Sequence, residues 1–185
     1  MTFHGFSKVC ILFARQKTWM KPLVVSLQHC KSCRLLHKHE KTGGISLPQE
    51  VFLSHSSKDR QMASQIAGML RRHGVPVWYS ETNLLGTQQW HDEISAALAR
   101  CDWFVILLTP QAAVSKWVKR ELLYALRSSR YEDRIVPINY RKCDSSRLSW
   151  TLDDFQAIDF TGRFDNGCRS LLRTWGLGFK KFAGP

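Results

Sequence analysis

The chain has 185 residues, and its 27 lysines and arginines exceed its 15 aspartates and glutamates by 12, so its formal net charge is +12 at pH 7. This length is that of one ordinary domain with an additional segment, and it is sufficient to bury a hydrophobic core. No apolar run approaches the roughly 20 residues of a membrane-spanning helix, and no secretory signal is evident. Scattered cysteines favour reduced thiols over a disulfide framework, so we expect a cytoplasmic protein.

Residues 1–47 form a basic N-terminal extension that we expect to lie outside the core fold. Eight lysines and arginines against one acid give this segment a charge of +7, which leaves +5 for the rest of the chain. Such a segment could bind nucleic acid or an acidic membrane surface through its charge. We favour a solvated tail, or an extension upstream of the true start, over nucleic-acid binding.

The same extension contains a C-x-x-C pair followed by histidine, which is a zinc-like fragment. The potential ligands are His29, Cys30, Cys33, His37 and His39. The second pair of ligands follows the first more closely than in the usual zinc knuckles and fingers, so the sequence predicts no metal site.

From about Glu50 onward, short apolar runs alternate with amphipathic helices. Val51 to Leu53 predicts a strand, and Ser56 with Asp59 forms a capping-box signature for the helix that follows. A second strand is predicted at residues 75–79, and a loop at residues 80–89 leads into a second helix. The run 103–108 is typical of a strand that is buried on both faces. The apolar positions of the two helices are Met62, Ala63, Ile66, Met69 and Leu70 in the first, and Trp90, Ile94, Ala97 and Leu98 in the second.

A third amphipathic helix is predicted at residues 115–127. Its core-facing set recurs at helical spacing and consists of Val118, Leu122, Ala125 and Leu126. Trp117, Glu121 and Tyr124 are predicted to form a separate stripe that is free to line a site. A lone carboxylate between basic neighbours is most often a solvated charge. Glu121 therefore becomes a candidate site residue only when its place in the predicted fold is considered.

Weaker runs at 135–138 and 157–160 and an amphipathic segment at 168–175 complete the pattern. Strict alternation of strand and helix predicts an α/β fold, with a central parallel sheet of about five strands and helices on both faces. Pro76 and Pro137 fit this prediction least well, because proline removes a ladder donor and prefers strand starts or edges. Ligands in such folds bind beyond the carboxyl ends of the strands, where the loops at 54–59, 80–89 and 109–116 lie.

Five segments in this order and spacing resemble a Toll/interleukin-1 receptor (TIR) domain of the bacterial kind. They are residues 52–59, the strand with Trp78, the loop with Gly86 and Trp90, the strand ending at residues 108–110, and Trp117 with Glu121. The resemblance covers about residues 49–175 and implies a flavodoxin-like TIR domain at 48–176, followed by a C-terminal tail at 177–185. Many bacterial relatives have a proline before the glycine and an acidic residue after it in the loop that is Leu84 to Gln88 here. That loop is implicated in self-association and ligand closure in the family.

The resemblance implies two alternative functions, because some TIR domains are scaffolds that bind other TIR domains and others cleave the nicotinamide–ribose bond of NAD+. Glu121 matches the catalytic glutamate of the second class, and Trp117 stands where its members also carry tryptophan. The implied enzyme is an NAD+ glycohydrolase that yields nicotinamide and ADP-ribose or a cyclic relative, with NAD+ as substrate and no cofactor. Bacterial members commonly act in defence against phage. Self-association and an activating partner protein are expected, and the alternative is a non-catalytic adaptor.

A single carboxylate is sufficient for this chemistry, because nicotinamide leaves as a neutral ring and needs no general acid. Glu121 could stabilise the positive charge that develops on the ribose or hold the ribose hydroxyls. The predicted substrate-binding residues are Ser54, His55, Lys58, Asp59, Gly86, Trp90 and Trp117. The amides of residues 56–59, assisted by Lys58, are expected to meet the diphosphate, and Trp117 to stack on a ring. No G-x-S-x-G, P-loop or G-x-G-x-x-G motif is present to favour a serine hydrolase or a redox enzyme.

Overall fold

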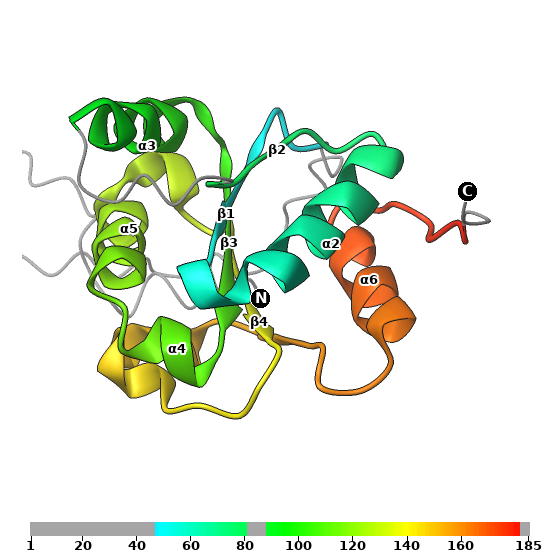
Figure 1. The fold of residues 1–185 in the computed structure, drawn as a ribbon. Helices are drawn as coiled ribbons and strands as arrows, with labels where there is room; N and C mark the ends of the chain where they lie inside the picture. The colour runs from blue at the N-terminus through cyan, green and yellow to red at the C-terminus, as the bar shows by residue number, and fades with distance from the viewer. Residues whose placement is uncertain (1–46, 81–87, 182–185) are drawn as a thin grey trace, which may run out of the picture. The chain divides into compact units, whose positions relative to one another are not determined.

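The computed structural model describes residues 47–80 and 88–181, without the side chains of Gln88 and Trp90. The basic extension with its zinc-like fragment and the loop around Gly86 therefore lie outside the described residues. Within the described ranges, the chain forms a parallel sheet flanked by helices on both faces (Figure 1). The predicted α/β fold is confirmed.

The sheet has five parallel strands in the order β2-β1-β3-β4-β5. The strands are β1 (Val51–Ser54), β2 (Val77–Trp78), β3 (Trp103–Leu108), β4 (Ile135–Asn139) and β5 (Ile158–Asp159). β2 and β5 have only two residues each, so both are shorter than predicted. The buried β3 lies at the centre of the sheet, as its uninterrupted apolar run indicates.

The helices divide between the two faces of the sheet according to the alternation of side chains along the strands. α2 (Arg60–Arg72) and α6 (Phe164–Arg173) cover one face, and α3 (Gln88–Arg100), α4 (Pro110–Ala113) and α5 (Lys116–Arg127) cover the other (Figure 1). Leu53 and Val105 pack with the first group, whereas Phe52 and Phe104 pack with the second. Short 3₁₀ helices, at Ser57–Asp59, Ser129–Tyr131, Ser145–Arg147 and Trp150–Asp154, lie in the connections.

The two prolines occupy positions where a missing donor leaves the sheet intact. Pro76 immediately precedes the edge strand β2, and its carbonyl accepts a hydrogen bond from the Val51 N–H at 2.8 Å. Pro137 lies within β4, where alternate residues bond to opposite neighbours. Arg134 and Tyr140 bond toward β3 and Asn139 toward β5, so Pro137 also faces the β5 side. Its nitrogen, which has no hydrogen to donate, lies before Ile138, the first residue of β4 that pairs with β5.

The strand order places a topological switch between β1 and β3. The chain leaves β1 toward α2 on one face, and it leaves β3 toward α4 and α5 on the other face. In parallel α/β sheets a crevice forms beyond the carboxyl ends of the two strands at such a point.

Candidate active site

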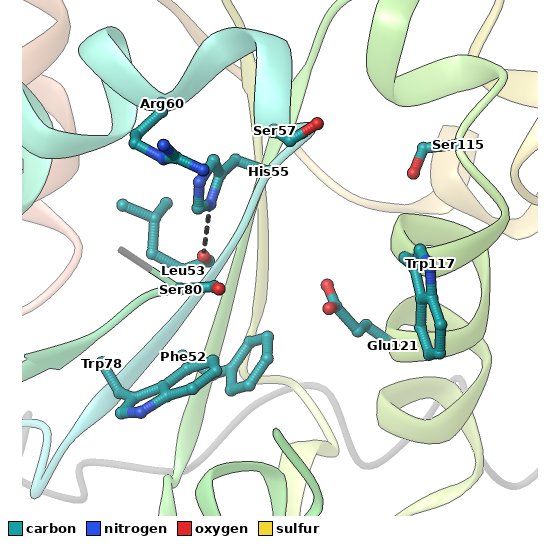
Figure 2. A pocket seen from close by; sticks show the side chains of 10 residues that line it. All are labelled: Phe52, Leu53, His55, Ser57, Arg60, Trp78, Ser80, Ser115, Trp117 and Glu121. Atoms are coloured by element: carbon teal, nitrogen blue, oxygen red, sulfur yellow. Dashed lines mark hydrogen bonds between the residues drawn. The ribbon is translucent and has the colours of Figure 1, made fainter. Parts of the chain in front are cut away.

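A pocket opens beyond the carboxyl ends of β1 and β2, between the start of α2 and the first turns of α5 (Figure 2). It has a volume of about 580 Å³ when the space open to solvent at its mouth is included. The lining residues are Phe52, Leu53, His55, Ser57, Arg60, Trp78, Ser80, Ser115, Trp117 and Glu121.

Glu121 is the acidic residue of this pocket, and its side chain is buried, with 9% of the residue exposed. The Ser54 hydroxyl at the end of β1 donates a hydrogen bond to Glu121 Oε2 at 2.5 Å. Burial raises the pKa of Glu121 to about 7, and the Ser54 hydrogen bond opposes that rise because it favours the charged form. Near neutral pH the site therefore holds a carboxyl group that both gains and loses its proton readily.

The predicted stripe on α5 is wrong in one respect. Glu121 does not lie apart from the core-facing set but is buried within it, next to Leu122 and one turn from Val118 and Ala125. Tyr124, which was predicted to continue the stripe, is 45% exposed. A lone acid between basic neighbours is most often solvated, but the carboxylate of Glu121 faces inward toward β1.

Trp117 lies one turn before Glu121 and is held by contacts from two helices. Its ring centroid is 4.7 Å from that of His91 on α3, with an interplanar angle of 50°. The Arg120 guanidinium lies 4.8 Å from the centre of the indole ring, a distance at which cation–π attraction operates. The helix that carries Trp117 is capped at its start by the Ser115 hydroxyl, which accepts from the Val118 N–H.

The stacked rings of Phe52 and Trp78 form the apolar side of the pocket, and Phe104 packs behind Phe52 in the core. The parallel register pairs Phe52 of β1 with Trp78 of β2 and with Phe104 of β3. The rings follow that register, since Phe52 stacks on Trp78 with centroids 4.8 Å apart and on Phe104 with centroids 5.5 Å apart. The site therefore presents flat apolar surfaces opposite its carboxyl group (Figure 2).

His55 follows β1 directly, and its ring is oriented by the backbone. Nδ1 lies 3.3 Å from the carbonyl oxygen of Leu53, which can only accept, so Nδ1 carries the proton. Burial lowers the pKa of His55, and the nearby positive charge of Arg60 lowers it further, against opposing effects of the Leu53 carbonyl and Asp59. The imidazole is therefore neutral near pH 7, and its Nε2 is available as an acceptor.

The structure brings together four of the predicted site residues. His55, Trp117 and Glu121 line the pocket, and Ser54 bonds to Glu121. Gly86 lies outside the described residues, as does the side chain of Trp90 on α3.

Two other predicted site residues, Lys58 and Asp59, line a separate polar hollow together with Gln61, Met62, Gln65, Tyr140 and Arg141. Asp59 is buried and accepts a hydrogen bond from Thr109 Oγ1 at 2.6 Å, which ties the start of α2 to the end of β3. The predicted capping box is therefore only half correct. Ser56 caps the 3₁₀ turn by accepting from the Lys58 N–H, but the carboxylate of Asp59 bonds to Thr109 instead of completing the box.

Several pocket residues were not predicted as site residues. Phe52 and Trp78 were assigned only to strands, and their stacking depends on a register that a single sequence does not show. Arg60 could have been found, since it follows directly on the predicted loop at 54–59. His91 does not line the pocket, and its contact with Trp117 could not be predicted because it joins α3 to α5, which are separated in the chain by β3 and α4.

Within residues 47–80 and 88–181, no group of three or more histidines, cysteines, aspartates or glutamates is arranged to hold a metal ion. The cysteines of these ranges, Cys101, Cys143 and Cys168, are unpaired. None of the described helices combines the length and apolar character that crossing a membrane requires.

Two curated bacterial proteins are similar to this chain in sequence. One is the 2′ cyclic ADP-D-ribose synthase BtTIR of Bacteroides thetaiotaomicron, which is 27% identical over 114 residues, or 60% of this chain and 40% of that protein. The other is the NAD(+) hydrolase TcpC of Escherichia coli O6:H1 strain CFT073, which is 26% identical over 114 residues, or 59% of this chain and 37% of that protein. The matched region thus spans about two-fifths of the length of these relatives.

Solved TIR domains share the fold. The TIR domain of the Toll-related receptor TRR-2 from Hydra magnipapillata superposes with a TM-score of 0.55 at 17% identity, covering 66% of this chain and 94% of that one. A TIR-STING receptor from C. gigas superposes with a TM-score of 0.55 at 18% identity, covering 69% of this chain and 39% of that one.

The sequence model of the TIR domain matches residues 51–172, which is more than half of the chain. The match begins at β1 and ends within α6, so it includes all five strands and all the residues that line the pocket. The chain belongs to the TIR domain family.

Proposed function

We propose that this domain cleaves the nicotinamide–ribose bond of NAD+ and releases nicotinamide together with ADP-ribose or a cyclic relative. The observation that supports this most is the buried Glu121, which faces an aromatic-lined pocket and has a pKa raised to about 7. The names of the two curated relatives, an NAD(+) hydrolase and a cyclic ADP-ribose synthase, favour the same chemistry. The proposal includes a role in bacterial defence against phage, a cytoplasmic location, an activating partner protein and self-association through TIR–TIR contacts.

Glu121 acts in this proposal as an anion placed beside developing positive charge. Nicotinamide leaves NAD+ as a neutral ring, so the electron pair of the breaking bond moves onto the ring nitrogen and the ribose becomes oxocarbenium-like. A carboxylate stabilises that cation most strongly in a site from which water is excluded. The Ser54 hydroxyl holds Oε2, which fixes the carboxylate against the end of β1.

The charge of the substrate favours the reactive state of the site. A cationic nicotinamide ring next to Glu121 lowers the pKa of the carboxyl group, because an opposite charge favours the ionised form. Substrate binding would therefore complete the ionisation of a group that is only partly ionised near neutral pH. Trp117 and the Phe52–Trp78 pair offer aromatic faces to the flat ring, and the neutral His55 offers an acceptor at Nε2.

The test is nicotinamide release from NAD+ by concentrated purified protein, with and without a crowding agent that promotes assembly. Glu121→Ala and Glu121→Gln are compared with Glu132→Gln, a matched change at an exposed glutamate. We expect release by the wild type and by Glu132→Gln, and its loss in both Glu121 variants while they remain folded. Release that the Glu121 changes do not affect would assign the activity to another group. No release under any assembly condition would favour the non-catalytic adaptor.

A further inference from the structure

The described lining of the pocket contains one carboxylate, Glu121, and one guanidinium, that of Arg60. Figure 2 shows them on opposite sides, with Arg60 at the start of α2 beside His55 and Glu121 on α5. The apolar rings of Phe52 and Trp78 lie along the wall below them. The pocket is therefore negative at one side and positive at the other.

This distribution of charge corresponds to that of a dinucleotide with a cationic ring. In NAD+ the positive nicotinamide is separated by a ribose from a negative diphosphate. With the ring next to Glu121, the diphosphate needs a cation farther along the pocket, and a guanidinium can bind phosphate oxygens through two parallel N–H bonds. The hydroxyl of Ser57, on the same side as Arg60, is a further donor for those oxygens.

Lys58, the other cationic residue near the start of α2, does not face the pocket that contains Glu121. Lys58 lines the separate polar hollow with Tyr140 and Arg141, and it is not among the residues that line the Glu121 pocket. The sequence-based expectation that Lys58 assists diphosphate binding therefore has less support than an assignment to Arg60. The lowered pKa of His55, to which the charge of Arg60 contributes, is consistent with a guanidinium that acts on the interior of this pocket.

We infer that Arg60 binds the diphosphate of the substrate, and that this contact makes the site selective for diphosphate-bearing nucleotides over nicotinamide riboside. The inference rests on the proposed function for the identity of the ring next to Glu121. Its ligand chemistry, a diphosphate between two ribosyl groups, is shared by the product ADP-ribose, so binding can be measured without turnover.

The test compares Arg60→Gln and Arg60→Lys with Arg173→Gln, a matched control at an exposed arginine of α6 that does not line the pocket. Lys58→Gln tests the alternative assignment. Binding of ADP-ribose is followed by tryptophan fluorescence, because Trp78 and Trp117 line the pocket. Loss of a charge-assisted pair is expected to weaken ADP-ribose binding by about tenfold or more in Arg60→Gln. Arg60→Lys should retain part of the affinity, and Arg173→Gln should bind as the wild type does. Lys58→Gln should lose less affinity than Arg60→Gln. In steady-state assays the KM for NAD+ should rise in Arg60→Gln while kcat changes little.

The outcomes separate this inference from the proposed function. Equal ADP-ribose affinity in Arg60→Gln and the wild type, or equal losses in Arg60→Gln and Lys58→Gln, would overturn the assignment of Arg60 even if NAD+ is cleaved. A wild type that releases no nicotinamide, but loses ADP-ribose affinity only on changes at Arg60, would refute the proposed function and support the diphosphate site. If Arg60→Gln does not fold, competition on the wild-type protein decides, because failure of inorganic pyrophosphate to displace ADP-ribose would refute the inference.

Discussion

Replacing Glu121 with glutamine is expected to stabilise the domain at alkaline pH. Glutamine keeps the size of the side chain and an oxygen that can accept from the Ser54 hydroxyl, but it has no proton to lose. The wild-type carboxyl group has a pKa of about 7 in the folded protein, against 4.5 for an unperturbed glutamate. Between these pH values the folded state holds a proton that the unfolded chain has released. The free energy of unfolding of the wild type therefore falls as pH rises through this window.

The size of the effect follows from the pKa difference. Each pKa unit corresponds to about 1.4 kcal/mol, so a rise from 4.5 to about 7 reduces the free energy of unfolding by about 3 kcal/mol once pH exceeds the higher value. The loss is absent below the unfolded pKa and complete above the folded one. Glu121→Gln should lack it, and its advantage over the wild type should grow by about 3 kcal/mol across the window.

Urea unfolding of both proteins between about pH 4 and about pH 8.5 measures this difference directly. Glu132→Gln serves as the control, because Glu132 is exposed and its replacement should leave the pH dependence of the wild type unchanged. Parallel stability curves for the wild type and Glu121→Gln would show that the carboxyl group is not desolvated. The argument that burial sets its ionisation would then be refuted.

Three further predictions concern the groups around the site. Ser54→Ala should raise the pKa of Glu121 further, because the Ser54 hydroxyl stabilises the charged form of the carboxyl group. The midpoint of the pH–activity profile should then move to higher pH, and an unchanged midpoint would contradict the prediction. Thr109→Val should lower the free energy of unfolding, measured in urea, by about 1–3 kcal/mol, because it removes the hydroxyl that donates to the buried carboxylate of Asp59. An unaltered midpoint of denaturation would show that this hydrogen bond does not contribute to stability. Gly167→Ala should lower the melting temperature, because the added Cβ would lie 2.6 Å from the ring of Phe160, and it should be partly rescued by Phe160→Leu; full stability of the single variant would exclude the clash.

Much of the fold was predictable because its periodicities are strong. The apolar run of β3 and the 3.6-residue patterns of α2 and α5 predict a layered α/β domain without knowledge of tertiary contacts. The edge strand β2 and the terminal strand β5 were overestimated in length. Each pairs with one neighbour, so its extent depends on where that neighbour stops, and apolar character alone does not show this.

The candidate site was predictable in its location but not in its detail. Parallel topology places the loops after β1 and β3 at one edge of the sheet, which is why Ser54, His55 and Glu121 were expected near one another. The burial of Glu121 was missed because a carboxylate within an apolar face requires a partner, and that partner, Ser54, lies 67 residues earlier in the chain. The bond between Asp59 and Thr109 could not be predicted for the same reason, since it spans 50 residues.

The placement of Pro137 has a consequence for the length of β5. The ladder between β4 and β5 begins at Ile138, and the Pro137 nitrogen lies just before this residue on the side that faces β5. Because proline has no N–H, a β5 strand that began earlier would find no donor at this position. The proline therefore helps to limit β5 to two paired residues, while the buried first half of β4 keeps its full ladder with β3.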